Sequence, residues 1–388
     1  MSYKLNQQIT NDMKDLHQDL VNLTKEICKI PAPSNFEDKR AEFCKEWFAQ
    51  NGIKNAYIDE ALNVVVPYNY DETKDLVVFM AHTDTVFPDT SPMPMKEENG
   101  RLCCPGVGDD TANLAILMQI AKYVVSKNLK PDYGILFVCN TGEEGLGNLK
   151  GSKKIIEKYG KQVKYFYSFD GTLEGCYNYS VGSVRYKVEI KTEGGHSFSD
   201  FGNKNAIAYM SSLINLLYTV KVPKGGKTTF NVGKISGGTS VNTIAQQVEM
   251  FFEYRSDVKE HLDTMIKLFE SAIETYKNMG IEVNVEVIGL RPCMGDVDKT
   301  LQKKLEENIV AAASTYFEEK VEFSSGSTDC NIPFSVGIPS CAIGGYIGGG
   351  AHTREEWIDI ESLKKGFPYL MSVVLDYFRK SNVNLYDE

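Results

Sequence analysis

The sequence predicts an α/β protein with a mainly parallel sheet flanked by helices and a smaller inserted α+β domain. Strand-like and helix-like segments alternate over residues 54–170, which is typical of parallel sheets. Over residues 179–291 the order changes to strand, helix, strand, strand, helix, strand, as in a ferredoxin-like domain. Helix–strand alternation resumes after Pro292. We therefore predict a discontinuous domain of residues 1–178 plus 292–388, interrupted by a domain of residues 179–291.

The N-terminal segment is expected to be helical. Residues 8–30 have amphipathic helical spacing that ends at Pro31. Ser34 or Asn35 can cap a second helix, and Gly52 can end it. Strands are then expected at residues 54–59, 63–68, 76–81, 134–138 and 164–169, and helices at 110–125 and 148–159. A loop rich in Pro and Gly separates the third strand from the next helix.

The inserted domain has its own pattern. Strands are expected at residues 179–191, 228–236, 247–256 and 281–288, and helices at 205–220 and 257–279. The strand at 179–191 alternates as an exposed strand does. We expect that it can pair or pack across a two-fold axis, the commonest symmetry of oligomers.

Composition excludes some classes of partner. The 388 residues are 42% hydrophobic and 24% charged, ordinary values for a globular protein large enough for two domains. A net charge of −10 without a basic run argues against nucleic acid and anionic membranes as partners. The sequence shows neither a signal-peptide core nor an apolar run of ~20 residues. Nine cysteines without zinc-site spacing indicate reduced core residues, and we expect a cytoplasmic protein.

Five short polar loops carry side chains that bind metals. They are His82-Thr83-Asp84, Gly108-Asp109-Asp110, Glu143-Glu144-Gly145, Phe169-Asp170-Gly171 and Ala351-His352-Thr353. Three of them follow β-rich runs, and strand ends converge at one edge of an open α/β sheet. Two histidines with three or four carboxylates suit two adjacent divalent cations. We therefore predict a dinuclear metallohydrolase.

Each loop also has a structural explanation. His82 and Asp84 can end a strand and cap a turn, and Asp109 or Asp110 can cap a helix. In the functional interpretation, His82 binds metal and Asp84 accepts its other ring N–H. Asp109 bridges two cations, and Asp110 shapes the turn.

Glu143 and Glu144 have two interpretations as well. They can be a pair of solvated loop carboxylates. Alternatively, Glu144 binds metal while Glu143 takes a proton from water that the metals acidify.

The ordered set of motifs resembles the dinuclear zinc peptidase and deacylase family. That family includes peptidase T, carboxypeptidase G, acetylornithine deacetylase, succinyl-diaminopimelate desuccinylase and aminoacylase, and the resemblance covers nearly the whole chain. It implies one metal held by His82, Asp109 and Asp170 and another held by Asp109, Glu144 and His352. It also implies Glu143 as general base and Asp84 as the partner of His82.

The inserted domain matches the lid and dimerisation domain of that family, which implies a homodimer through residues 179–291. His196 matches a histidine that stabilises the oxyanion, in several members from the neighbouring subunit. Asn242 matches a polar substrate contact. Arg255 matches an arginine that holds a substrate carboxylate, a task that suits a planar guanidinium.

The resemblance implies an exopeptidase that hydrolyses short peptides with two divalent metal ions per chain. Zinc is expected, and cobalt or manganese also fits such ligands. Asp170-Gly171 looks most like peptidase T, whereas residues 195–202 differ from that enzyme.

Three other functions agree less well with these residues. An N-acyl amino acid deacylase of the same family is the alternative. A non-catalytic metal-binding dimer is disfavoured because it needs no base such as Glu143. A nucleotide-binding protein is disfavoured because no phosphate-loop motif follows a strand.

Overall fold

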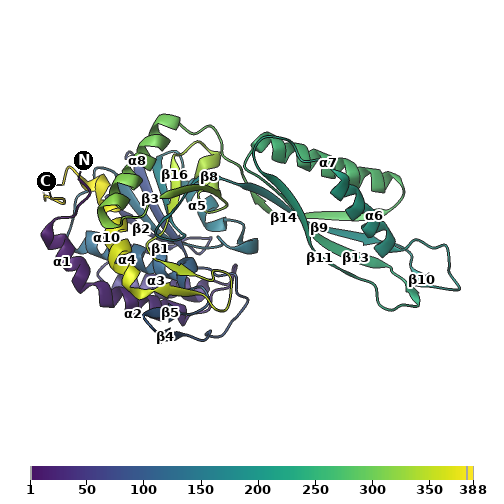
Figure 1. Ribbon diagram of the computed structural model, residues 1–388, viewed down its shortest axis with the longest axis horizontal. Coiled ribbons are helices and arrows are strands. Elements are labelled where there is room, and N and C mark those ends of the chain that lie inside the picture. Colours follow the sequence, from purple (N-terminus) through teal and green to yellow (C-terminus); the bar gives the residue numbers. More distant parts are fainter. Residues whose placement is uncertain (1, 382, 388) are drawn as a thin grey trace. The chain divides into compact units, whose positions relative to one another are not determined.

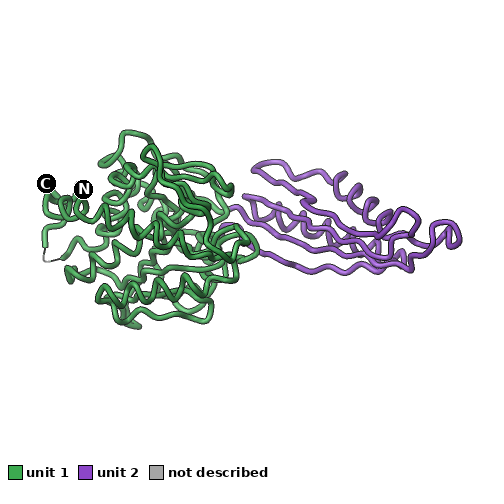
Figure 2. The backbone as a smooth tube through the Cα atoms, turned by 90° about the horizontal axis from the view of Figure 1, so that it is seen from below, with its two compact units in different colours: residues 1–180, 295–388 green, residues 181–294 purple. Residues whose placement is uncertain are grey.

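The chain forms two compact units in the computed structural model, which describes residues 2–381 and 383–387 (Figures 1 and 2). Unit 1 comprises Met1–Ser180 and Gly295–Glu388, and unit 2 comprises Val181–Met294. Unit 2 therefore interrupts unit 1 in sequence. In the described part of the chain no helix is long and apolar enough to cross a membrane.

Unit 1 is built on an eight-stranded sheet with the order β1-β2-β6-β3-β7-β16-β8-β15. Its strands are β1 (Tyr57–Ile58), β2 (Val64–Tyr68), β6 (Gly134–Asn140), β3 (Leu76–His82), β7 (Val163–Phe169), β16 (Ser340–Ile343), β8 (Gly175–Ser180) and β15 (Glu322–Gly326). The central strands β6, β3, β7 and β16 are parallel, whereas β2 and β8 join them antiparallel. Strands β3 and β6 are buried along their whole length, as expected for strands covered on both faces. The predicted mainly parallel sheet is confirmed.

Helices cover this sheet. They are α1 (Gln7–Asp15), α2 (His17–Cys28), α3 (Asp38–Gln50), α4 (Asn113–Ser126), α5 (Lys150–Tyr159), α8 (Lys299–Tyr316), α9 (Asn331–Ser335) and α10 (Leu363–Leu375). The single helix predicted at residues 8–30 is wrong, because the chain bends at Leu16 between α1 and α2. The bend lets α1 contact α10 while α2 contacts α4.

A small second sheet of unit 1 was not predicted. Its order is β17-β18-β5-β4, formed by β4 (Lys96–Glu98), β5 (Arg101–Cys103), β17 (Gly348–Gly349) and β18 (Trp357–Asp359). Strand β18 pairs with both β17 and β5. This pairing ties the loop before Asp109 to the glycine-rich segment before His352.

Unit 2 is a four-stranded antiparallel sheet with two helices. It consists of β9 (Gly182–Lys191), α6 (Ala206–Thr219), β11 (Thr228–Gly237), β13 (Gln247–Ser256), α7 (Lys259–Asn278) and β14 (Glu282–Arg291), with a short pair β10 (Gly195–His196) and β12 (Thr243–Ile244). The sheet order is β11-β13-β9-β14, and both helices contact β13 and β9. Side chains such as Val188, Met250 and Phe269 form its core.

The prediction of one strand over residues 179–191 is wrong. Tyr179 belongs to β8 in the sheet of unit 1, and β9 begins at Gly182. Strand β9 lies between β13 and β14, so it cannot pair with another chain. Its alternating burial arises because one face packs on α6 and α7, and the edge strands are β11 and β14.

Candidate metal centre

The predicted ligands of unit 1 converge at one edge of its large sheet. His82 is the last residue of β3, and Asp170 follows β7 directly. Glu143 and Glu144 follow β6 after a short turn. Because these strands are parallel, their carboxyl ends meet at the same edge.

Asp109 lies at the centre of this cluster. Its Oδ1 is 3.0 Å from Nε2 of His82, and its Oδ2 is 3.0 Å from Nε2 of His352. Glu144 Oε1 is also 3.0 Å from Nε2 of His352. Two ligands of a tetrahedral ion with bonds of about 2.05 Å lie roughly 3.3 Å apart, close to these spacings.

The described side chains form three groups suited to a cation, and two of them contain Asp109. One is His82, Asp109 and Asp170, and the other is Asp109, Glu144 and His352, with candidate ligand atoms in each group within 4.8 Å of one another. His82, Glu143 and Glu144 form a third such group. A carboxylate with each oxygen facing a different imidazole is placed to bridge two cations.

Asp84 orders the loops around these ligands. Its main-chain carbonyl lies 3.0 Å from Nδ1 of His82, whereas its carboxylate oxygen lies 3.5 Å away. Donation from Nδ1–H to the carbonyl leaves the Nε2 lone pair for a metal. The Asp84 carboxylate accepts from the backbone N–H of Glu143 at 3.0 Å and of Glu144 at 2.9 Å, and from the Ser34 hydroxyl at 2.6 Å. It therefore fixes the main chain of both glutamates.

Glu356 has a role that sequence reasoning missed. This buried carboxylate accepts three backbone N–H groups, from Gly106 at 2.6 Å, Gly108 at 2.9 Å and Asp109 at 2.7 Å. It thereby holds the loop that presents Asp109. In the sequence Glu356 stands next to another glutamate and resembles a solvated pair, so only its spacing of four residues from His352 marks it.

Asp110 acts on the opposite side of the same loop. Its carboxylate accepts from the backbone N–H of His82 at 2.9 Å and from Nδ2 of Asn113 at 2.8 Å. It thus joins the end of β3 to the start of α4.

The negative charge of the clustered carboxylates favours the binding of cations at this site. Burial raises the pKa of Glu144 to about 7. Burial also raises the pKa of Asp170 well above its usual range, and the charge of Asp109 adds to this effect. For Asp109 burial opposes ionisation, but hydrogen bonds from His352 and His82 hold its pKa below the usual range. Two divalent ions would supply the positive charge that buried carboxylates need.

In unit 2 the structure brings His196 and Asn242 together. Strand β10 pairs His196 with Thr243 of β12, and the Ser197 N–H donates to the Asn242 carbonyl at 3.0 Å. Nδ1 of His196 accepts from the backbone N–H of Phe198 at 3.2 Å and of Ser199 at 3.3 Å. The proton then resides on Nε2, which makes that atom a hydrogen-bond donor.

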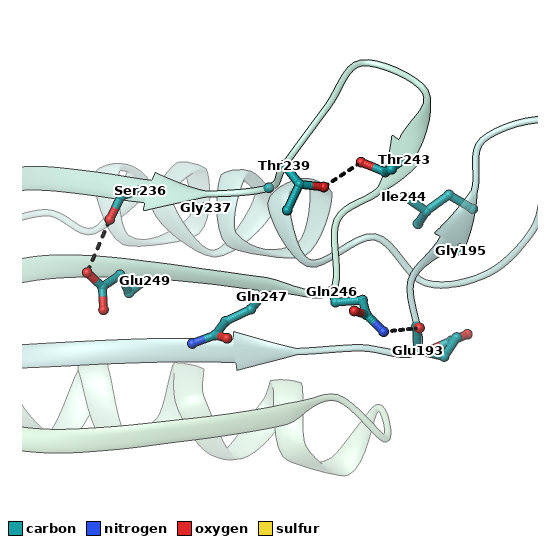
Figure 3. A pocket seen from close by; sticks show the side chains of 11 residues that line it. Glu193, Gly195, Ser236, Gly237, Thr239, Thr243, Ile244, Gln246, Gln247 and Glu249 are labelled. Carbon is teal, nitrogen blue, oxygen red and sulfur yellow. Dashed lines mark hydrogen bonds between the residues drawn. The ribbon is translucent and has the colours of Figure 1, made fainter.

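A pocket of about 610 Å³ lies beside this loop (Figure 3). Gly195, next to His196, lines it together with Thr239 and Thr243, whose hydroxyls are 3.0 Å apart. Gln246 closes one side by donating to the Glu193 carbonyl at 2.9 Å. The walls offer several polar groups to a ligand.

Arg255 lies apart from His196 and Asn242 within unit 2. It pairs with Ser183 near the far end of β13, roughly 26 Å from Gln247 at ~3.3 Å per residue. Its Nε contacts Glu253 at 2.9 Å, and Arg185 contacts the same carboxylate at 3.3 Å.

Arg255 belongs to a group of three guanidiniums. Burial lowers the pKa of Arg185, and the nearby guanidiniums of Arg291 and Arg255 lower it further. The Glu253 carboxylate pairs with two of these three arginines, Arg185 and Arg255.

The fold and the ligand pattern agree with one family of hydrolases. Residues 78–376, most of the chain, match peptidase family M20/M25/M40. The chain belongs to this family, whose peptidases and deacylases hydrolyse peptide or amide bonds.

Similar proteins span nearly the same length. The uncharacterized protein YqjE of Bacillus subtilis (strain 168) is 25% identical over 371 residues, covering 90% of this chain and 95% of the relative. Carboxypeptidase G2 of Pseudomonas sp. (strain RS-16) is 25% identical over 358 residues, covering 89% and 84%. The crystal structure of a tripeptidase from Staphylococcus aureus shares the fold, with a TM-score of 0.73, 23% identity and coverage of 94% and 99%.

Proposed function

We propose that the chain is a metal-dependent exopeptidase that hydrolyses short peptides with a dinuclear zinc site. Asp109 carries the proposal, because its two oxygens contact two different imidazoles. His82, Asp109 and Asp170 would hold one ion, and Asp109, Glu144 and His352 the other. Zinc suits this mixture of imidazole and carboxylate ligands, and Co²⁺ or Mn²⁺ also fits.

Glu143 is proposed as the general base. Two bound cations would acidify water and polarise the substrate carbonyl. Glu143 would take the proton of the attacking water and pass it to the leaving amine. The hydrogen bonds of Asp84 to the main chain of Glu143 and Glu144 keep the base beside a ligand.

His196 is proposed to stabilise the oxyanion from the second chain of a homodimer. The contacts of its Nδ1 support this role, because they leave Nε2–H to donate. Strand β11 is an edge strand with one side unpaired in the described chain, and edge strands readily pair with another chain. Beside it α6 exposes Leu216 and Tyr218, and Tyr218 accepts from the Val232 N–H of β11 at 3.3 Å. We propose this surface of unit 2 as the dimer interface.

The substrate contacts are assigned to unit 2. Asn242 would contact a polar group of the substrate. Arg255 would hold a substrate carboxylate, supported by its place close to the guanidinium of Arg185. Because an N-acyl amino acid also has a carboxylate, this observation supports the deacylase alternative as well.

The nine free cysteines support a cytoplasmic location.

Metal content and a substrate panel test the proposal. Protein purified without chelator should contain close to two divalent ions per chain. Chelator should abolish hydrolysis, and zinc or cobalt should restore it. Short peptides should be cleaved faster than N-acyl amino acids. Full activity with no metal would contradict the metal centre, and faster cleavage of N-acyl amino acids would favour the deacylase.

A further inference from the structure

A second pocket, of about 430 Å³, lies in unit 1 beside the loops that carry the metal ligands. Its ten lining residues are all uncharged. Most of the wall is apolar, formed by Pro33, Phe36, Val86, Phe87, Pro88 and Leu146. The volume falls within the range of about 300–1,000 Å³ that is usual for small-molecule sites.

The pocket is lined by residues that directly neighbour those of the candidate metal centre. Thr85 and Gly145 line it, and each directly follows a residue of the centre, Asp84 and Glu144 respectively. Ser34, also in the wall, donates to the Asp84 carboxylate at 2.6 Å and lies 3.1 Å from the Glu144 carbonyl. Because consecutive Cα atoms are about 3.8 Å apart, the walls at Thr85 and Gly145 lie within one residue's length of Asp84 and Glu144.

The walls are preformed. The Thr85 N–H donates to the Ala32 carbonyl at 2.9 Å, which fixes the 32–36 turn against the strand end. The Arg354 guanidinium lies 4.9 Å from the centroid of the Phe87 ring and bonds Asp89 at 2.7 Å. Both contacts hold the loop after β3 in place.

Three apolar side chains of this pocket face solvent. Phe36 is 68% exposed, Leu146 is 55% exposed and Val86 is 37% exposed. The contact of water with clustered apolar surface is unfavourable. An apolar ligand that covers the three side chains removes this surface from water. A charged side chain would find no charged partner in the wall and would lose hydration.

We propose that this pocket binds an apolar side chain of the substrate, of leucine or phenylalanine size, next to the scissile bond. The inference rests on the proposed peptidase function and adds a substrate preference to it. The metal-loaded enzyme should hydrolyse peptides with leucine or phenylalanine at one position beside the scissile bond at least ~10-fold faster, in kcat/KM, than alanine peptides.

Two variants at exposed positions test the wall. Leu146→Ser and Phe36→Ala should each reduce the leucine-to-alanine ratio of kcat/KM by roughly 10-fold while metal content stays at the wild-type value. Phe323→Ala is the matched control, because Phe323 is 41% exposed in β15 of the same unit and does not line the pocket. An unchanged ratio in both pocket variants would overturn the inference.

A binding measurement separates this inference from the proposed function. Calorimetry on the metal-loaded protein should show L-leucinamide binding at least ~10-fold more tightly than glycinamide, and Leu146→Ser should abolish the difference. If no peptide is hydrolysed but this discrimination is found, the peptidase proposal fails and the pocket stands. Equal affinity of the wild type for both amides, or discrimination that survives in Leu146→Ser, would overturn the pocket.

Discussion

The metal-centre loops of unit 1 and the His196 loop of unit 2 are held in opposite ways. His82 is 1% exposed and Glu144 6%, and backbone hydrogen bonds to buried carboxylates order their loops. His196 is exposed, and its loop displays Phe198 at 87% and Phe201 at 90% exposure. Clustered exposed aromatic side chains usually mark a surface that another molecule covers. The proposed ligands are therefore buried and held by neighbouring loops, whereas the His196 loop is exposed in this chain.

Among variants of these two loop regions, we expect the largest loss of activity at Glu143. Glu143→Gln should keep both metals and lower kcat by roughly 10²–10⁴-fold, because the amide cannot accept the proton. Glu144→Gln should lose metal affinity as well as activity. Elemental analysis beside steady-state kinetics measures both effects, with Glu60→Gln as a control because the side chain of Glu60 is 81% exposed. If the two variants kept metal equally and lost activity equally, the assigned roles would be wrong.

His196→Ala should have the next largest effect. Removing an oxyanion donor should lower kcat by roughly 10²–10³-fold with metal content unchanged. His261→Ala, on α7 of the same unit, is the matched control and should retain activity.

Mixed dimers decide whether His196 acts from the partner chain. Glu143→Gln and His196→Ala chains that are unfolded and refolded together should recover roughly a quarter of wild-type activity. Half of the dimers are then mixed, and half of their sites combine both intact residues. If mixed dimers form without recovery, His196 does not act across the dimer.

A smaller effect is expected from the residue behind Asp109. Glu356→Gln should weaken metal binding by roughly 10–100-fold, because the amide accepts poorly from three backbone N–H groups at once. Glu355→Gln changes the adjacent, exposed glutamate and should leave affinity unaltered. Competition with a chelating dye measures the metal dissociation constant of each variant. Equal affinities in the two variants would show that the Asp109 loop keeps its shape without Glu356.

The sequence predicted the fold where local patterns decide it. Strands β3 and β6 were found from continuous apolar runs, and the strands and helices of unit 2 from their periodicity. The small sheet of β4, β5, β17 and β18 was missed, because its short strands lie in Pro- and Gly-rich segments and its central pair, β18 with β5, is formed over more than 240 residues. Long-range pairing of this kind leaves no local signal.

The same limit applies to the site. The five proposed ligand side chains stand in short motifs, and the structure gathers them into two groups that share Asp109. Glu356 acts through main-chain donors of a distant loop, so no motif surrounds it. The predicted pairing of the 179–191 strand with another chain was wrong for a related reason. Alternating burial in β9 arises from its one packed face and does not indicate which strands lie on either side of it.

The smallest effect is expected at Asn242. Its Oδ1 accepts from the Ser240 hydroxyl at 2.7 Å, and the residue is exposed, so its removal should not disturb the fold. One neutral hydrogen bond to substrate contributes about 1 kcal/mol. Asn242→Ala should therefore raise KM by roughly 5–10-fold and leave kcat and metal content close to wild type, the pattern of uniform binding. Asn284→Ala, an exposed asparagine on β14, is the control. A fall in kcat with KM unchanged would instead place Asn242 among the groups that act on the transition state.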